Sequence, residues 1–108
     1  MPNQSHTLDL AFQALADPGR RAMVRRLSRG PTSVSQLARP LAMSLPAVMQ
    51  HLAVLEQSGL VRSQKIGRVR TCHINPNTLQ LAEAWINERR ADWSARLDRL
   101  GEFLREES

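Results

Sequence analysis

Residues 33–61 read SVSQLARPLAMSLPAVMQHLAVLEQSGLV, and this stretch carries the signals of two short helices joined by a four-residue turn. Ser33 and Gln36 have the spacing of a capping box, which predicts that the first helix begins at this point. Pro40 has no backbone N–H to donate to a preceding carbonyl, so it bends or ends that helix. We therefore expect a helix-turn-helix between Ser33 and Gly59.

The second helix of this motif has clear start and stop signals. Ser44 can cap it, and Pro46 fits its first turn, where no intrahelical donor is needed. Gly59 is placed to end it in the left-handed conformation that glycine tolerates. Helical spacing turns three residues toward a core: Val48, Leu52 and Leu55. The outer surface is left to Leu45, Pro46, Met49, Gln50 and Ala53.

Two further helices are predicted before this motif. Apolar residues near the N-terminus recur at helical spacing: Leu8, Phe12 and Leu15. Asp17 and Pro18 end that helix and start the next, with Asp17 as the N-cap and Pro18 at the first helical position. The next helix runs roughly over residues 18–28, and Gly30-Pro31 closes it.

A β-hairpin is predicted directly after the motif. Residues 60–66 and 68–74 favour β structure on either side of Gly67, which is typical of a two-stranded wing. Because side chains alternate along a strand, Arg68 and Arg70 are expected to share one face. Three basic residues mark this wing: Lys65, Arg68 and Arg70.

The C-terminal part of the chain, from residue 77 to 106, is predicted to be one long helix. Its apolar residues recur at three-, four- and seven-residue intervals: Leu79, Ala82, Ile86, Trp93, Leu97, Leu100 and Leu104. Thirty helical residues would extend about 45 Å, which is too long for one small domain to cover. We therefore expect part of this stripe to pack against a second subunit.

Positive charge is concentrated around the helix-turn-helix. Between Pro18 and His73 there are ten Lys and Arg residues and one acid, Glu56, whereas the rest of the chain has five basic and nine acidic residues. The local net charge of +9 therefore exceeds the overall net charge of +5. A helix-turn-helix in such a segment favours nucleic acid as the partner.

Length and composition narrow the class of protein. The 108 residues suit one small domain over 1–108, with the helix-turn-helix at 33–59, the wing at 60–75 and a dimerisation helix at 77–106. No apolar run is long enough for a membrane span and the N-terminus lacks signal-peptide features, so we expect a cytoplasmic protein. A single cysteine, Cys72, excludes an intrachain disulfide and a multi-cysteine zinc site within one chain.

Three segments in this order resemble a known family. They are FQALADPGRRAMVRRLSRGP at residues 12–31, the stretch quoted above at 33–61, and RSQKIGRVRTCHINP at 62–76. Together they resemble the ArsR-type winged-helix transcriptional repressors, in particular small members that lack the metal-binding motifs. The resemblance covers most of the chain, although the final helix matches only in kind.

The resemblance implies a mainly α fold with a β wing, dimerised through the first and last helices. The helix after Ser44 would lie in the major groove of double-stranded DNA, and the wing would reach phosphates or the minor groove. A two-fold dimer would present two such helices about 34 Å apart and read an inverted repeat, often in the protein's own promoter. The expected homodimer residues are Leu8, Phe12, Trp85, Trp93, Leu97, Leu100 and Leu104.

The candidate DNA contacts differ in chemistry. Gln50 can pair with adenine and Ser44 can bind a phosphate. Met49 stands where family members commonly have a small or polar residue, which implies an altered target. His51 borders the core, so a partly buried hydrogen-bonding role and a phosphate contact are equal alternatives, while Arg21 could instead pair with an acid. The full set is Arg21, Ser44, Leu45, Pro46, Met49, Gln50, His51, Lys65, Arg68 and Arg70.

A metal site or cofactor is not expected. Metal-sensing members carry cysteines in the helix that corresponds to residues 33–40, or an acid and histidine set in the last helix, and this chain has neither. Cys72 and His73 are adjacent on a strand and point to opposite faces, which is poor geometry for chelation. A metal- or thiol-responsive sensor that uses Cys72 is thus a less favoured alternative function.

Other functions fit the sequence less well than a dimeric DNA-binding repressor. A protein-interaction module could use the C-terminal helix, with DNA binding secondary. An RNA-binding role is disfavoured because an exposed stacking platform is missing from a chain with two Phe, two Trp and no Tyr. The chain has no nucleophile–base pair, phosphate loop or carboxylate cluster, so we do not expect an enzyme. The operator and any small-molecule effector stay unknown at this stage.

Overall fold

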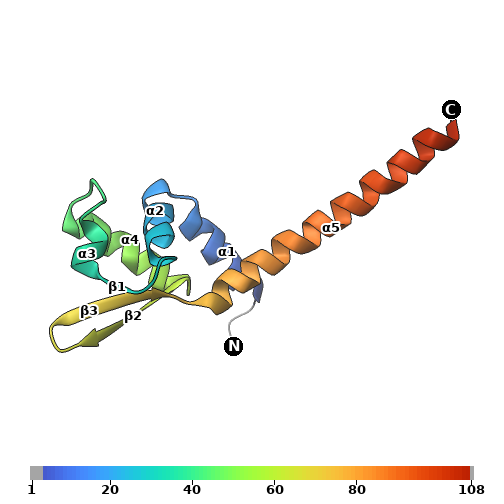
Figure 1. The fold of residues 1–108 in the computed structure, drawn as a ribbon. Helices are drawn as coiled ribbons and strands as arrows, with labels where there is room; N and C mark the ends of the chain where they lie inside the picture. Colours follow the sequence, from blue (N-terminus) through green and yellow to red (C-terminus); the bar gives the residue numbers. More distant parts are fainter. Residues whose placement is uncertain (1–3, 108) are drawn as a thin grey trace.

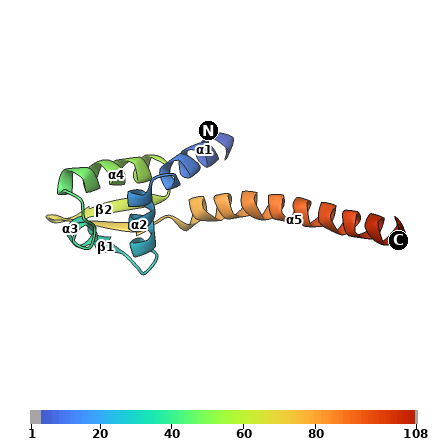
Figure 2. The same cartoon turned by 90° about the horizontal axis from the view of Figure 1, so that it is seen from above.

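A computed structural model describes residues 4–107 of the chain. Figures 1 and 2 show the earlier helices and a small sheet gathered in one body, from which the last helix projects as a separate rod. The elements, in chain order, are α1 (Gln4–Leu15), α2 (Pro18–Leu27), β1 (Thr32–Ser33), α3 (Val34–Ala38), α4 (Leu45–Gln57), β2 (Val61–Ile66), β3 (Val69–Ile74) and α5 (Pro76–Glu107).

Three helices begin with the capping side chains that the sequence predicts. In each case a side-chain oxygen accepts from a backbone N–H three residues later, which satisfies one of the donors that a helix start leaves free. The acceptor and donor residues are Asp17 and Arg20 at 3.0 Å, Ser33 and Gln36 at 3.2 Å, and Ser44 and Ala47 at 3.3 Å. The start positions of α2, α3 and α4 are therefore encoded locally.

The connection between α3 and α4 is longer than the predicted four-residue turn. Helix α3 ends at Ala38 and α4 begins at Leu45, so residues 39–44 link the two helices. Pro40 accounts for the early end, because it has no N–H to continue the helical hydrogen bonds. The Leu41 N–H instead donates to the Ala38 carbonyl at 3.1 Å.

The wing belongs to a three-stranded antiparallel sheet in the order β1-β3-β2, rather than to the two-stranded hairpin expected from the sequence. Strand β1 pairs Thr32 with Cys72 and Ser33 with Thr71. The prediction omitted this strand because two residues are too few to show an alternating pattern, and because Ser33 carries the signal of a helix cap.

The tip of the hairpin also differs from the prediction. Ile66 pairs with Val69, which leaves Gly67 and Arg68 as a two-residue turn. A type II′ turn has glycine with a positive φ at its first central position. Gly67 occupies that position with φ 64°, and Arg68, like every other non-glycine residue that the structure describes, has no positive φ. Arg68 therefore lies in the turn and does not share a strand face with Arg70, which pairs directly with Lys65.

The core lies between the helices of the body and the inner face of the sheet. All three residues of α4 that were predicted to point inward, Val48, Leu52 and Leu55, are buried. Burying each such side chain stabilises the fold by about 2 kcal/mol. The other largest fully buried side chains are Met23, Leu37, Leu60, Val61 and Cys72.

Gly59 after α4 is required by both its conformation and its surroundings. Its φ of 84° is left-handed, and a Cβ at this position would lie 3.0 Å from the Thr78 Oγ1. The predicted C-terminal glycine signal of α4 is therefore confirmed. It also brings the start of α5 against the end of α4.

Helix α5 is the one element that leaves the body. Its 32 residues extend about 48 Å, and only its first turns pack on α1. The Cα radius of gyration is 18.9 Å, compared with about 13 Å for a compact chain of this length. None of the helices in residues 4–107 has the length and apolar content needed to cross a membrane.

Candidate nucleic-acid interface

The outward face of α4 is the centre of the candidate interface. The residues predicted to lie on this surface are all exposed: Leu45, Pro46, Met49, Gln50 and Ala53. The other face of α4 is buried in the core by Val48, Leu52 and Leu55. Helix α4 is therefore held rigidly by one face and offers the other face to a partner.

The first turn of α4 has the properties of a phosphate-binding helix end. Ser44 caps it and is exposed, and the aligned peptide dipoles place partial positive charge at this end. Pro46 has no N–H, and the Ala47 and Val48 N–H groups donate to Ser44, so an anion at this end would meet the positive end of the dipole and the Ser44 hydroxyl. A phosphate contact by Ser44 stays a prediction, which its exposed position allows.

A hydrogen-bonded chain links α4 to the wing, and sequence reasoning did not predict it. Arg70 Nη1 donates to Ser63 Oγ at 2.9 Å, and the Ser63 hydroxyl donates to the Glu56 carboxylate. The available signal was Glu56 itself, because it is the one acid between Pro18 and His73. Arg70 is thus engaged within the protein, whereas the Lys65 and Arg68 side chains are exposed at the wing tip and make no such hydrogen bond among the described residues.

His51 lies on the side of α4 that faces α2. Its Nδ1 is 3.4 Å from Arg20 Nη1 and 3.8 Å from Asp17 Oδ2, and the side chain is 23% exposed. The backbone N–H of Arg20 makes the largest contribution to lowering the pKa of Asp17, and the His51 and Arg20 side chains lower it further. This position fits the partly buried alternative, and a DNA contact by His51 stays a prediction.

Two arginines of α2 close the C-terminal end of α1. Arg20 donates to the Ala14 carbonyl at 2.7 Å and the Gln13 carbonyl at 3.2 Å, and Arg21 donates to the Leu15 carbonyl at 2.8 Å. Carbonyls in the last turn of a helix have no following turn to pair with, although the Gln13 carbonyl also accepts from the Ala16 N–H at 3.2 Å. The arginines therefore have a structural role that the sequence did not indicate, and Arg21 stays a predicted DNA contact.

Cys72 lies in the core of the body. Its side chain is fully buried on the inner face of the sheet, and this burial raises the pKa of the thiol, as does the charge of Glu56. No group of three or more His, Cys, Asp or Glu residues that could hold a metal ion occurs within residues 4–107.

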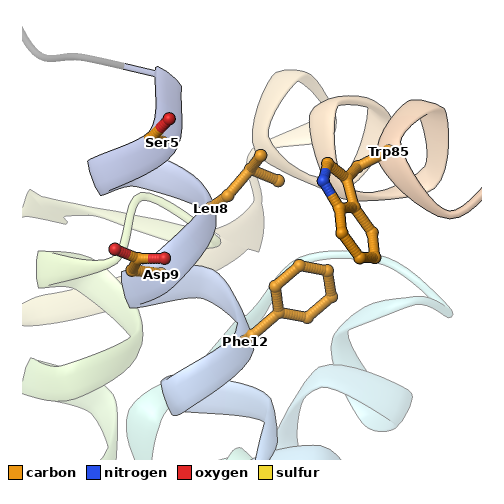
Figure 3. A pocket seen from close by; sticks show the side chains of 5 residues that line it. All are labelled: Ser5, Leu8, Asp9, Phe12 and Trp85. Atoms are coloured by element: carbon orange, nitrogen blue, oxygen red, sulfur yellow. The ribbon is translucent and has the colours of Figure 1, made fainter.

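The predicted dimerisation residues lie on α1 and along α5. Figure 3 shows Leu8 and Phe12 of α1 and Trp85 of α5 around a pocket of about 420 Å³, which Ser5 and Asp9 also line. The Phe12 and Trp85 rings meet edge to face, with centroids 5.7 Å apart. Farther along α5 the exposed residues of the stripe are Trp93, Leu97, Leu100 and Leu104.

Comparisons with known proteins agree on the fold and the motif. Residues 15–64 match a family model described as a helix-turn-helix domain. The regulator Rv2034 of Mycobacterium tuberculosis, a helix-turn-helix-type transcriptional regulator, is 49% identical over 71 residues, which cover 66% of this chain and 66% of the relative. The chain therefore spans about two thirds of the length of that relative.

Solved structures extend the similarity to nearly the whole chain. The ArsR family transcriptional regulator RHA00566 superposes with a TM-score of 0.78 at 49% identity, covering 87% of this chain and 97% of that one. A homodimeric winged helix-turn-helix domain, Mb0332 from Mycobacterium bovis, has a TM-score of 0.65 at 21% identity, covering 79% and 81%. The second likeness shows the fold alone.

Proposed function

The chain belongs to the ArsR family of winged helix-turn-helix transcriptional regulators, and we propose that it is a homodimeric repressor that binds an inverted-repeat DNA operator. One observation carries the proposal: α4 exposes a full face within a segment whose net charge is +9. In this proposal residues 1–108 form one domain that acts in the cytoplasm. It regulates transcription by binding DNA and does not catalyse a reaction.

The bare apolar stripe of α5 supports the homodimer. Trp93, Leu97 and Leu100 are exposed in a single copy, which is unfavourable for a helix in water. The related fold of Mb0332 is homodimeric, so a two-fold arrangement is compatible with this architecture. Two copies of α4 placed about 34 Å apart would meet successive major grooves of an inverted repeat.

The proposed contacts divide into two kinds. Gln50 and Met49 read base edges, because they stand on the exposed face of α4. Ser44 and the basic residues of the wing tip, Lys65 and Arg68, bind the phosphate backbone. Arg70 contributes charge nearby while its guanidinium is engaged by Ser63.

Titration of the purified protein against DNA tests the proposal. The probes are the duplex from directly upstream of its own gene and a scrambled duplex of the same composition, each at several salt concentrations. We expect tighter binding to the upstream duplex and an affinity that falls steeply with salt. Equal affinity for both duplexes would reject specificity, and a flat salt response would reject phosphate contacts.

A matched pair of variants tests whether the wing contacts phosphates. Arg68→Gln removes a charge from the wing turn of each copy and should reduce the salt slope of the dimer by about two, one for each lost phosphate contact. Glu102→Gln on α5 changes a charge away from α4 and the wing, so its slope should match the wild type. An unchanged slope for Arg68→Gln would remove Arg68 from the proposed contacts.

The exposed stripe of α5 also favours a second function, a protein-interaction module that binds a heterologous partner. That function predicts a monomer in solution, or a dimer that does not depend on Leu97, Leu100 and Leu104. Sedimentation of the wild type and of a triple alanine variant distinguishes it from the repressor.

A further inference from the structure

A cleft of about 290 Å³ lies between the start of α3, the first turns of α4 and the tip of the wing. Three large apolar side chains line it and are about half exposed: Leu45 at 54%, Met49 at 44% and Val69 at 52%. The other residues of the lining are Ser33, Val34, Ser35, Arg68 and Arg70. The cleft is therefore an apolar surface with a basic and hydroxyl-bearing rim.

This combination restricts what the cleft can bind. An apolar group of exposed side chains marks a binding surface, since leaving them in water is unfavourable. The rim arginines and the positive end of α4 disfavour a plain apolar partner and favour a polyanion. Duplex DNA is a polyanion that also offers apolar groups, because the C5-methyl group of thymine lies on the base edges of the major groove.

We propose that Leu45 and Met49 bind thymine methyl groups in the major groove, with Val69 closing the wing side of the cleft. This inference rests on the proposed DNA-binding function and names the base chemistry that the same surface selects. The neighbouring Gln50 can read adenine, so the face as a whole favours A·T pairs.

The spacing of the two side chains sets the spacing of the bases. Leu45 and Met49 are four residues apart on α4, so their Cβ atoms are separated by about 5–6 Å. Successive bases on one strand rise by about 3.4 Å. Each half-site should therefore present thymine methyl groups one or two base-pair steps apart, and a homodimer should require two such half-sites.

Selection from a random duplex pool, followed by single-methyl substitution, tests the inference. Enriched duplexes are resynthesised with uracil in place of each thymine, which removes only the methyl group. In the wild-type protein we expect each contacted thymine to lose about fourfold in affinity on replacement by uracil. The Leu45→Ala/Met49→Ala variant should bind thymine and uracil duplexes equally.

The variants need a matched control and a check on folding. Val54→Ala removes an exposed apolar side chain about two and a half turns along α4 from Leu45, on the opposite side of the helix, and it should keep the full preference for thymine. Met49→Gln keeps the length of the side chain and removes its apolar end, so it should lose part of the preference. Thermal unfolding of each variant confirms that the fold is intact.

Each outcome has a distinct meaning. A pool without any enriched sequence would overturn the DNA-reading function together with this inference. Enriched sites that tolerate uracil at every position would overturn the inference and leave sequence-specific binding standing. A thymine preference that survives in Leu45→Ala/Met49→Ala, or a dimer that dissociates in this variant, would show that the cleft does not bind thymine.

Discussion

The body of the protein and the distal part of α5 use apolar residues at helical spacing in opposite ways. In the body, Leu37, Leu52 and Leu55 are buried by other segments of the same chain. Beyond Ala82, every residue of α5 up to position 106 is exposed apart from Gly101. The same sequence pattern therefore produces a closed core in one region and an open stripe in the other.

The two regions also differ in charge. The segment that contains α2, α3, α4 and the wing carries a net charge of +9, whereas residues 76–107 contain five basic and seven acidic residues. The proposed attraction to a polyanion and the proposed association with a second copy thus use separate surfaces. We infer that each can be altered without disturbing the other.

The largest expected effect comes from removing the stripe. Leu97→Ala/Leu100→Ala/Leu104→Ala should raise the dimer dissociation constant at least ~1,000-fold, since each leucine contributes about 1.5 kcal/mol or more when buried. Sedimentation equilibrium measures the shift. Glu102→Ala, on the opposite side of α5, is the control and should leave the dimer intact. Persistence of the wild-type dimer in the triple variant would place the interface elsewhere.

The next prediction compares the loss of stability when a large side chain is truncated in the core and on distal α5. In the background of that triple variant, Leu55→Ala should lower the free energy of unfolding by about 3 kcal/mol, because it leaves a cavity in the core. Trp93→Ala in the same background should change it by less than about 0.5 kcal/mol, because the side chain is 61% exposed. Urea unfolding measures both. Equal losses would mean that distal α5 packs on its own body.

A smaller effect is expected at Ser44, where two variants distinguish its role as a helix cap from its role as a DNA contact. Ser44→Ala removes the acceptor for the Ala47 N–H and should lower the free energy of unfolding by about 1 kcal/mol. Ser44→Asp keeps a capping acceptor and the stability, but its charge repels phosphate and should weaken DNA binding. If Ser44→Asp bound DNA as tightly as the wild type, Ser44 would not contact phosphate.

The smallest effect concerns the charge of Asp17 at the start of α2. Its pKa is lowered in the folded state, so its contribution is complete above the unfolded-state pKa and is lost as the pH falls through the folded-state value. Below about pH 4 the wild type should therefore lose stability faster than Asp17→Asn, which keeps a cap without a titrating group. Urea unfolding between pH 3 and 6 measures this difference. Parallel pH curves would contradict the assignment.

Local signals in the sequence were enough for most helix boundaries. Asp17, Ser33 and Ser44 cap their helices as predicted, because a cap needs only a side chain and a backbone N–H three residues away. Pro40 and Gly59 end helices for similarly local reasons of backbone geometry. The exposed and buried faces of α4 also followed directly from helical periodicity.

Contacts between distant segments could not be predicted in this way. The pairing of Thr32 with Cys72 creates the third strand, and the register of Ile66 with Val69 moves Arg68 into the turn. The Arg70–Ser63–Glu56 chain joins the wing to α4 through side chains whose spacing in the sequence shows no motif. Such contacts depend on how elements pack, which no short window of sequence records.

By itself, the sequence determined the order of helices, the basic helix-turn-helix and the resemblance to ArsR regulators, because capping, turns and amphipathic periodicity act over a few residues. Only the tertiary structure decided which apolar side chains are enclosed and which stay open. It brought Leu45 and Met49 of α4 beside Val69 of the wing, and it left the stripe of α5 bare. The physical reason is that burial depends on the whole set of neighbours in space.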